Sequence, residues 1–203
     1  MADLIDAESA FAYGETILTG DRVRLRGLRE ADVPVLAQWE MDPGRMVTSA
    51  NQVRPPSEGA ARQQVAGWCA NDRDDSIGFA VETAGEPSVL IGCLGLSGIR
   101  PKDRVATLAI SLGREHLGQG YGTDAIRVLV GYAFREMALH RIQLDVWPFN
   151  QQAIRAYESI GFVEEGRRRS AVWHDGQWYD QVLMGILESE WAGGRGTTEA
   201  AGD

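Results

Sequence analysis

The chain has 203 residues, a formal net charge of −9, and apolar and charged fractions of 44% and 24%, which predict one ordinary globular domain. Cys69 and Cys93 are its two cysteines and form no C-x-x-C pair, which excludes zinc fingers and disulfide scaffolds and favours the reducing cytoplasm. The acidic charge disfavours nucleic acid, and it can favour a cationic partner, although a role in solubility alone is the preferred interpretation. No apolar stretch is long enough to predict a membrane partner.

The first half of the chain predicts one strand, two helices and three further strands. Alternation of Val23 and Leu25 indicates the first strand, and Asp32 followed by Pro34 begins the first helix. Ser57 is a suitable cap for the second helix, whose apolar side chains recur at helical spacing. The three further strands are expected at 77–83, 89–96 and 105–112. Segment 41–56 contains four proline and glycine residues and is expected to be a loop.

The second half predicts a long helix, a strand, a short helix and a hairpin. The long helix is expected over 121–137, and the strand over 142–146. Asn150 caps the short helix and Gly161 ends it. The hairpin strands, 162–172 and 178–187, are joined through Asp175-Gly176, a pair that suits a tight turn. This order predicts an α/β sheet with helices on its faces and not a regular βαβ repeat.

The two ends of the chain are expected to lie outside the compact domain. Residues 1–17 show weak periodicity and are interpreted as an N-terminal extension. Residues 192–203 are rich in Gly, Thr and Ala and are expected to be a disordered tail. The compact domain is therefore expected over 18–191.

A glycine-rich loop, Gly118-Gln119-Gly120-Tyr121-Gly122-Thr123, stands between a predicted strand and the long helix. Glycines let a ligand approach the backbone, and the free N–H groups and dipole of a helix start favour an anion such as a pyrophosphate. The loop lacks the lysine of a nucleotide-hydrolase phosphate loop, and its third glycine comes one residue too early for a dinucleotide fingerprint. A plain turn and helix cap remains the alternative for the loop alone.

A second motif, N-x-x-A-x-x-x-Y-x-x-x-G-F, runs from Asn150 to Phe162. Each residue has an ordinary structural explanation, but its combination with the glycine loop and an intervening strand is distinctive. Together, residues 112–162 resemble the GNAT superfamily of acyl-CoA N-acyltransferases. Residues 157–191 resemble its spermidine and ribosomal-protein acetyltransferase branch, so the resemblance spans about 18–191, the expected N-acetyltransferase domain.

The resemblance implies a mixed, mostly antiparallel, splayed sheet of about seven strands with helices on both faces, and acetyl-CoA between the fourth and fifth strands. No metal is expected. Backbone groups of Ile110, Ser111 and Leu112 are expected to pair with the pantetheine arm, which Asn150 also contacts. Tyr157 is expected to be the catalytic acid that protonates the departing thiolate. The residues expected to hold the pyrophosphate through their N–H groups are Gly118, Gln119, Gly120, Tyr121, Gly122 and Thr123.

Two positions depart from the family pattern. Leu117 replaces the Arg or Gln that usually begins the loop motif, which matters little where backbone groups bind the phosphates. Thr107 stands where relatives often carry a glutamate that assists the amine, and a threonine is not a general base at neutral pH. Asp145 and Glu82 are possible substitutes, although each is also a candidate for a structural ion pair.

The resemblance implies an N-acetyltransferase in which a primary amine attacks the thioester directly. The amine can belong to a protein N-terminus, a polyamine or another small molecule. An α-amine, with a pKa of about 7.7–8 against about 10.4 for a side-chain amine, needs less help from a base. The missing glutamate therefore slightly favours either an α-amine acceptor or a base that acts through a water molecule. The alternative is a non-catalytic acyl-CoA-binding sensor, which would not need the Tyr157 hydroxyl. The oligomeric state stays open, a homodimer included.

Overall fold

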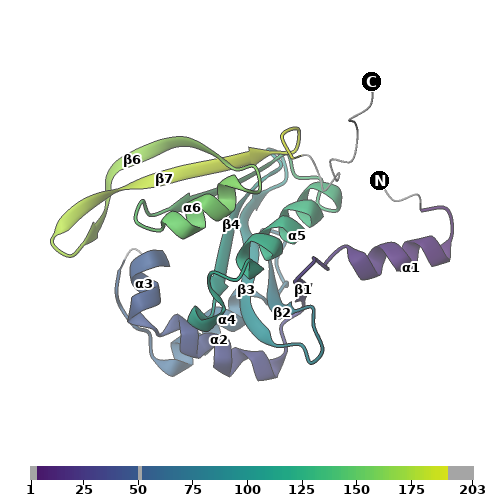
Figure 1. Cartoon of the computed structure of the whole chain (residues 1–203), viewed down its shortest axis with the longest axis horizontal. Helices are drawn as coiled ribbons and strands as arrows, with labels where there is room; N and C mark the ends of the chain where they lie inside the picture. Colours follow the sequence, from purple (N-terminus) through teal and green to yellow (C-terminus); the bar gives the residue numbers. More distant parts are fainter. Residues whose placement is uncertain (1–3, 50–51, 192–203) are drawn as a thin grey trace.

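The computed structural model describes residues 4–49 and 52–191, which form a seven-stranded sheet flanked by helices (Figure 1). The strand order is β1-β2-β3-β4-β5-β7-β6, with every neighbouring pair antiparallel except β4 and β5. The strands are β1 (Val23–Arg26), β2 (Ser76–Thr83), β3 (Leu90–Arg100), β4 (Val105–Leu112), β5 (Arg141–Val146), β6 (Val163–His174) and β7 (Gln177–Leu187). The α-helices are α1 (Ala7–Thr16), α2 (Val33–Glu40), α3 (Pro43–Ser49), α4 (Glu58–Trp68), α5 (Tyr121–Arg135) and α6 (Gln151–Glu158). The expected mixed, mostly antiparallel sheet is confirmed.

Helices cover both faces of the sheet, as expected. The larger core joins α5 and α6 to one face and includes Leu129, Leu144 and Tyr157. A smaller core beneath α2 and α4 on the other face includes Leu36, Val65 and Cys93. The β6–β7 hairpin extends beyond the other strands and arches over α6 (Figure 1).

Two of the three helix starts read from the sequence carry a side-chain cap. The Ser57 hydroxyl accepts a hydrogen bond from the Ala60 N–H at the start of α4, and the Asn150 side chain does the same for Ala153 at the start of α6. Asp32 precedes α2, but its carboxylate accepts from the Arg29 N–H and from Arg26 instead of capping the helix.

Two short helices occur where none was predicted. The expectation of a loop over 41–56 was wrong at α3, whose first turn is fastened by the Asp42 carboxylate accepting from the Gly44 N–H. The N-terminal extension contains α1, which a capping box between Asp6 and Ser9 begins. The Tyr13 hydroxyl of α1 donates to Glu136 beyond the end of α5. The predicted tail, 192–203, lies outside the described residues.

Candidate active site

The sheet opens between its two parallel strands. β4 and β5 are paired at Val105↔Arg141, Ala106↔Ile142 and Thr107↔Gln143, and the pairing ends there. β5 stays paired with β7 as far as Val146↔Val182. Beyond Thr107↔Gln143, however, β4 and β5 are no longer paired with each other. A cavity of about 710 Å³ occupies this opening. Its walls are residues 107–112 of β4, 145–147 at the end of β5, the start of α5, most of α6 and the end of α3.

The start of α5 forms one end of the cavity. Gly118 and Gly120 have φ angles of +73° and +83°, values that favour glycine, and Gly120 is the N-cap of the helix. A Cβ at Gly122 would lie 3.2 Å from the Leu112 Cδ1 atom, so the helix packs closely on β4. The free N–H groups of the first helical turn and the positive end of the helix dipole suit a pyrophosphate at this end of the cavity.

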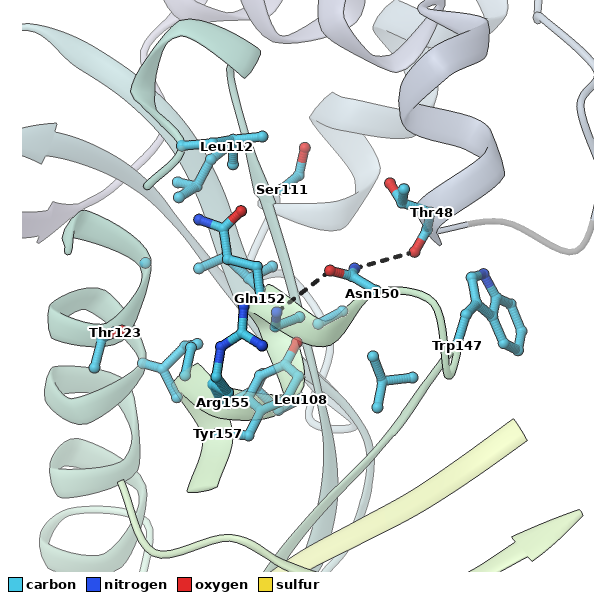
Figure 2. Close-up of a pocket in the computed structure, with 18 of the residues that line it drawn as sticks. Thr48, Leu108, Ser111, Leu112, Thr123, Trp147, Asn150, Gln152, Arg155 and Tyr157 are labelled. Carbon is cyan, nitrogen blue, oxygen red and sulfur yellow. Dashed lines mark hydrogen bonds between the residues drawn. The ribbon is translucent and has the colours of Figure 1, made fainter. Parts of the chain in front are cut away.

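Asn150 connects two of the walls. Its Oδ1 atom accepts from the Ala153 N–H at 3.3 Å, which caps α6, and its Nδ2 atom donates to the Thr48 carbonyl at 3.4 Å (Figure 2). The first bond fixes the start of α6, and the second joins α6 to the end of α3. Because Tyr157 lies on α6, its position depends on this cap.

Tyr157 is a buried aromatic residue with its hydroxyl at the cavity. Its side chain is 8% exposed, and its ring packs against Phe162 at a centroid distance of 5.8 Å. Burial, together with the negative charge of Asp145, raises the pKa of Tyr157 to about 12. The hydroxyl therefore stays protonated at neutral pH and is available as a proton donor.

Most of the site residues expected from the sequence line this one cavity. They are Ile110, Ser111, Leu112, Gly118, Gly120, Gly122, Thr123, Asn150 and Tyr157. Gln119 and Tyr121 do not line it. The Gln119 carbonyl accepts from Arg22 in an adjoining hollow, and Tyr121 packs against the larger core. The Ser111 hydroxyl turns away from the strand opening and donates to the buried Glu40 of α2.

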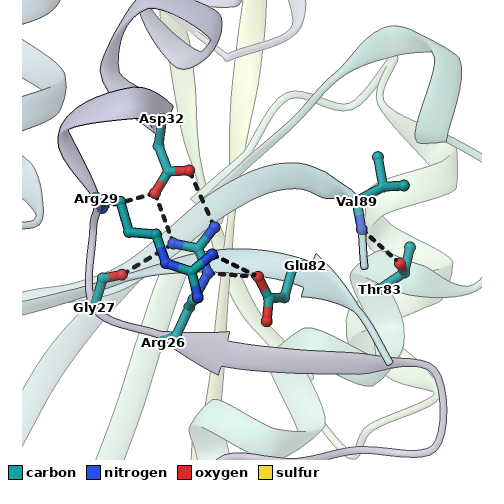
Figure 3. Close-up of polar contacts among 7 residues, drawn as sticks. All are labelled: Arg26, Gly27, Arg29, Asp32, Glu82, Thr83 and Val89. Atoms are coloured by element: carbon teal, nitrogen blue, oxygen red, sulfur yellow. Dashed lines mark hydrogen bonds and ion pairs between the residues drawn. The ribbon is translucent and has the colours of Figure 1, made fainter. Parts of the chain in front are cut away.

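The two candidate substitutes for the missing glutamate have different surroundings. Glu82 is buried and bonded to Arg26 at 2.5 Å, with Arg29 at 3.7 Å, so it belongs to a structural ion-pair cluster away from the cavity (Figure 3). Asp145 lines the cavity and accepts from the Gln181 Nε2 atom at 2.5 Å. Thr107 also lines the cavity, where its hydroxyl accepts from Gln143 at 3.4 Å.

Several cavity residues were missed from the sequence. Arg45 and Thr48 belong to α3, the helix that was expected to be a loop. Trp147 follows the last residue of β5, and Gln152 and Arg155 lie on α6 beside the predicted motif residues. For α6 the signal was partial: Gln152 and Arg155 are three residues apart and share a helix face with one another, but their spacing from Tyr157 does not place them on the face of Tyr157.

The described part of the chain has two further properties, which concern membranes and metals. No helix there is long and apolar enough to cross a membrane. Within the same residues, no group of three or more His, Cys, Asp or Glu side chains is placed to hold a metal ion.

Comparisons with known proteins agree with this geometry. The model of the acetyltransferase (GNAT) domain matches residues 22–163. The chain is 36% identical over 120 residues to the probable N-acetyltransferase YjcK of Bacillus subtilis, an alignment covering 59% of this chain and 66% of that protein. It is 25% identical over 187 residues to the ribosomal protein uS5-alanine N-acetyltransferase of Escherichia coli, covering 88% and 94%. The crystal structure of spermidine N-acetyltransferase from Vibrio cholerae with CoA and spermine superposes with a TM-score of 0.73 at 28% identity, covering 83% and 96%.

Proposed function

The chain belongs to the GNAT family of acetyltransferases, which use acetyl-CoA, and we propose that it transfers an acetyl group to a primary amine in the cavity between β4 and β5. The observation that carries the proposal is the end of β4–β5 pairing at Thr107↔Gln143, directly beside the glycine-rich start of α5. That arrangement offers unpaired strand backbone and an anion-binding helix start along one continuous cavity. Acetyl-CoA supplies the acetyl group as a reactive thioester.

Different residues along the cavity bind different parts of acetyl-CoA. Backbone N–H groups from Gly118 to Thr123 hold the pyrophosphate at the start of α5. Backbone groups of Ile110, Ser111 and Leu112 pair with the pantetheine arm, because the parallel pairing of β4 with β5 has already ended. Asn150 orients the same arm and holds α6 in place.

Tyr157 completes the site as the proton donor. Its raised pKa keeps the proton on the hydroxyl, and no hydrogen-bond partner of that hydroxyl lies among the described residues. A positioned donor stabilises negative charge that builds on a leaving sulfur. The hydroxyl distinguishes an enzyme from a protein that only binds acyl-CoA, because binding does not need it.

The proposal also includes a cellular location and an oligomeric state. Cys69 and Cys93 are both free and buried, which supports a cytoplasmic location. Sedimentation analysis tests the homodimer that the sequence leaves open.

Calorimetry and a coupled thiol-release assay test the proposed function. We expect micromolar binding of acetyl-CoA, a thermal shift on binding, and CoA release that depends on added amine. Binding without turnover over a broad amine panel would make the protein an acyl-CoA sensor. Absence of binding at millimolar acetyl-CoA would refute the proposal.

A further inference from the structure

The glycine-rich loop that begins α5 has no charged side chain of its own. Residues 117–123 contain none, so a pyrophosphate there depends on backbone N–H groups. CoA carries a further phosphate on the 3′ carbon of its ribose, a monoester with a charge of about −1.5 to −2 at pH 7. Arginine side chains recognise such a group best, because the guanidinium donates two parallel hydrogen bonds to phosphate oxygens. A cation for the 3′-phosphate therefore has to come from outside the loop.

A second hollow, which we call the outer hollow, lies directly beside this loop. It has a volume of about 410 Å³ and is lined by the segment before β1, part of the loop and the first two turns of α5. Gly120 and Thr123 line both the outer hollow and the main cavity, so the two spaces adjoin over the loop. In CoA the pyrophosphate joins the pantetheine arm to the ribose. With the arm along β4 and the pyrophosphate over the loop, the ribose and its 3′-phosphate reach the outer hollow.

Arg22, in the segment before β1, is held over the loop. Its Nη1 atom donates to the Gln119 carbonyl at 3.1 Å, and its Cδ, Nε and Cζ atoms lie 3.8–3.9 Å from the place that a Cβ on Gly120 would take. Its backbone N–H donates at 2.8 Å to the carboxylate of Asp124, a buried residue of the first turn of α5. A guanidinium has five N–H donors, so the bond to Gln119 orients the group and leaves other donors for a ligand.

Arg127, on the second turn of α5, brings a second guanidinium to the outer hollow. Its side chain is 47% exposed, and its Nη1 atom lies 3.8 Å from the Asp124 Oδ1 atom, a long contact for an ion pair. The Asp124 carboxylate already accepts from two backbone N–H groups, those of Arg22 at 2.8 Å and Val23 at 3.2 Å. Asp21, the other acidic residue that lines the outer hollow, is exposed, so water and salt screen its charge. The outer hollow therefore presents two guanidinium groups to a phosphate.

We infer that Arg22 and Arg127 bind the 3′-phosphate of acetyl-CoA in the outer hollow, and that Asp124 positions Arg22 for this contact. The inference rests on the proposed function and names the residues that select its acyl donor. It makes the complete CoA nucleotide a requirement for tight binding. A thioester of 3′-dephospho-CoA, or of phosphopantetheine alone, would leave both guanidinium groups without their ligand.

Calorimetric titration with CoA and with 3′-dephospho-CoA tests the inference. The unmodified protein should bind 3′-dephospho-CoA with a Kd at least about tenfold higher than that of CoA. Arg22→Gln and Arg127→Gln should each raise the Kd for CoA by about 3- to 10-fold, less than for a buried charged pair because both side chains are exposed, and leave the Kd for 3′-dephospho-CoA unchanged. Arg22→Lys keeps the charge without the paired donors and should retain part of the preference. A variant that only distorts the loop or the fold would weaken both ligands by the same factor.

Two further arginines provide matched controls. Arg24, on β1, is exposed and lines neither the main cavity nor the outer hollow, so Arg24→Gln removes the same charge without the contact. The ratio of the two Kd values in this variant should equal that of the unmodified protein. Arg155, on α6, lines the main cavity and not the outer hollow, so Arg155→Gln should change the two Kd values by the same factor.

Equal Kd values for CoA and 3′-dephospho-CoA in the unmodified protein overturn the inference, as does an unchanged ratio in the variant that combines Arg22→Gln with Arg127→Gln. Loss of the preference in Arg155→Gln, with the preference kept in the Arg22 and Arg127 variants, would assign the 3′-phosphate to the main cavity and also overturn it. In each of these cases CoA still binds, so the proposed function stands. Absence of binding by either ligand at millimolar concentration would instead refute the proposed function, and the inference with it.

Discussion

At the scale of single residues, the proposed chemistry depends on one hydroxyl. Tyr157→Phe keeps the ring that packs against Phe162 and removes the proposed proton donor. We expect kcat to fall by about 10²–10⁴, the usual cost of losing a positioned acid, while acetyl-CoA affinity stays the same. Tyr132→Phe is the control, since Tyr132 is a partly buried tyrosine of α5 outside the cavity. Steady-state kinetics decide the matter: equal kcat values for the Tyr157→Phe variant and the unmodified protein would remove Tyr157 from the mechanism.

Gly120 is the residue on which the anion-binding loop depends. Its φ of +83° costs an L-residue about 1–2 kcal/mol, and a branched side chain more, so Gly120→Val should shift the loop and its N–H groups. A Cβ there would meet Arg22 at an ordinary 3.8 Å, so the backbone and not a clash causes the effect. We expect acetyl-CoA affinity measured by calorimetry to weaken by at least about tenfold in a folded protein. Gly85→Val, in open space, is the control, and equal affinities in both variants would mean that the loop is a plain turn.

At the scale of elements, α6 connects binding with catalysis through its cap. Asn150→Ala removes the cap bond to Ala153 and the bond to Thr48, and should cost about 1 kcal/mol of unfolding free energy and lower kcat as Tyr157 becomes less well held. Asn150→Asp keeps an oxygen for the cap but loses the donor to Thr48, so its stability should stay near that of the unmodified protein. Urea unfolding of the two variants provides the measurement. An equal loss of stability in the two variants would mean that the contact with α3, and not the cap, is responsible for the loss.

The elements also explain where prediction from the sequence failed. β4 and α5 were located because alternation, glycine spacing and helical periodicity are properties of adjacent residues. α3 is short, begins at a proline and contains a glycine, so its local pattern resembles that of a loop. Its helical state accompanies a contact that is distant in sequence, the bond from Asn150 to the Thr48 carbonyl.

At the scale of the whole molecule, a buried ion-pair cluster ties β1 and β2 to the segment before α2. Arg26 bonds Asp32 at 2.6 Å and Glu82 at 2.5 Å, and all three side chains are at most 13% exposed (Figure 3). Arg26→Met removes the nearest counter-charge of two buried carboxylates and should cost about 3–5 kcal/mol of unfolding free energy at pH 7. Arg62→Met, which removes an exposed pair with Glu58 on α4, should cost about 0.5 kcal/mol or less. Urea unfolding measures the unfolding free energy of both variants. Equal losses of unfolding free energy would contradict the importance of burial.

The same cluster predicts how stability depends on pH. Burial opposes ionisation of Asp32, but hydrogen bonds from Arg26 and the Arg29 N–H outweigh it and hold the pKa of Asp32 below its ordinary value of 3.8. A carboxylate with a lowered folded pKa contributes stability above its unfolded pKa, and the contribution is lost as pH falls through the folded value. We expect this contribution to be present at pH 5 and to disappear below about pH 3.8. The stability difference between Arg26→Met and the unmodified protein should shrink over that interval, and a constant difference would contradict the linkage.

The sequence by itself determined the glycine-rich end of the cavity and the start of α6. The glycine loop, the Asn150 cap and the spacing to Tyr157 are local patterns, and a backbone conformation or cap is set mainly by neighbouring residues. Tertiary structure decided the acceptor half. Whether Asp145 or Glu82 is available depends on partners far along the chain, with Gln181 36 residues from Asp145 and Arg26 56 residues from Glu82. Folding likewise decided the position of Arg22, because the Gln119 carbonyl that it contacts lies 97 residues away and no local pattern encodes such a distant contact.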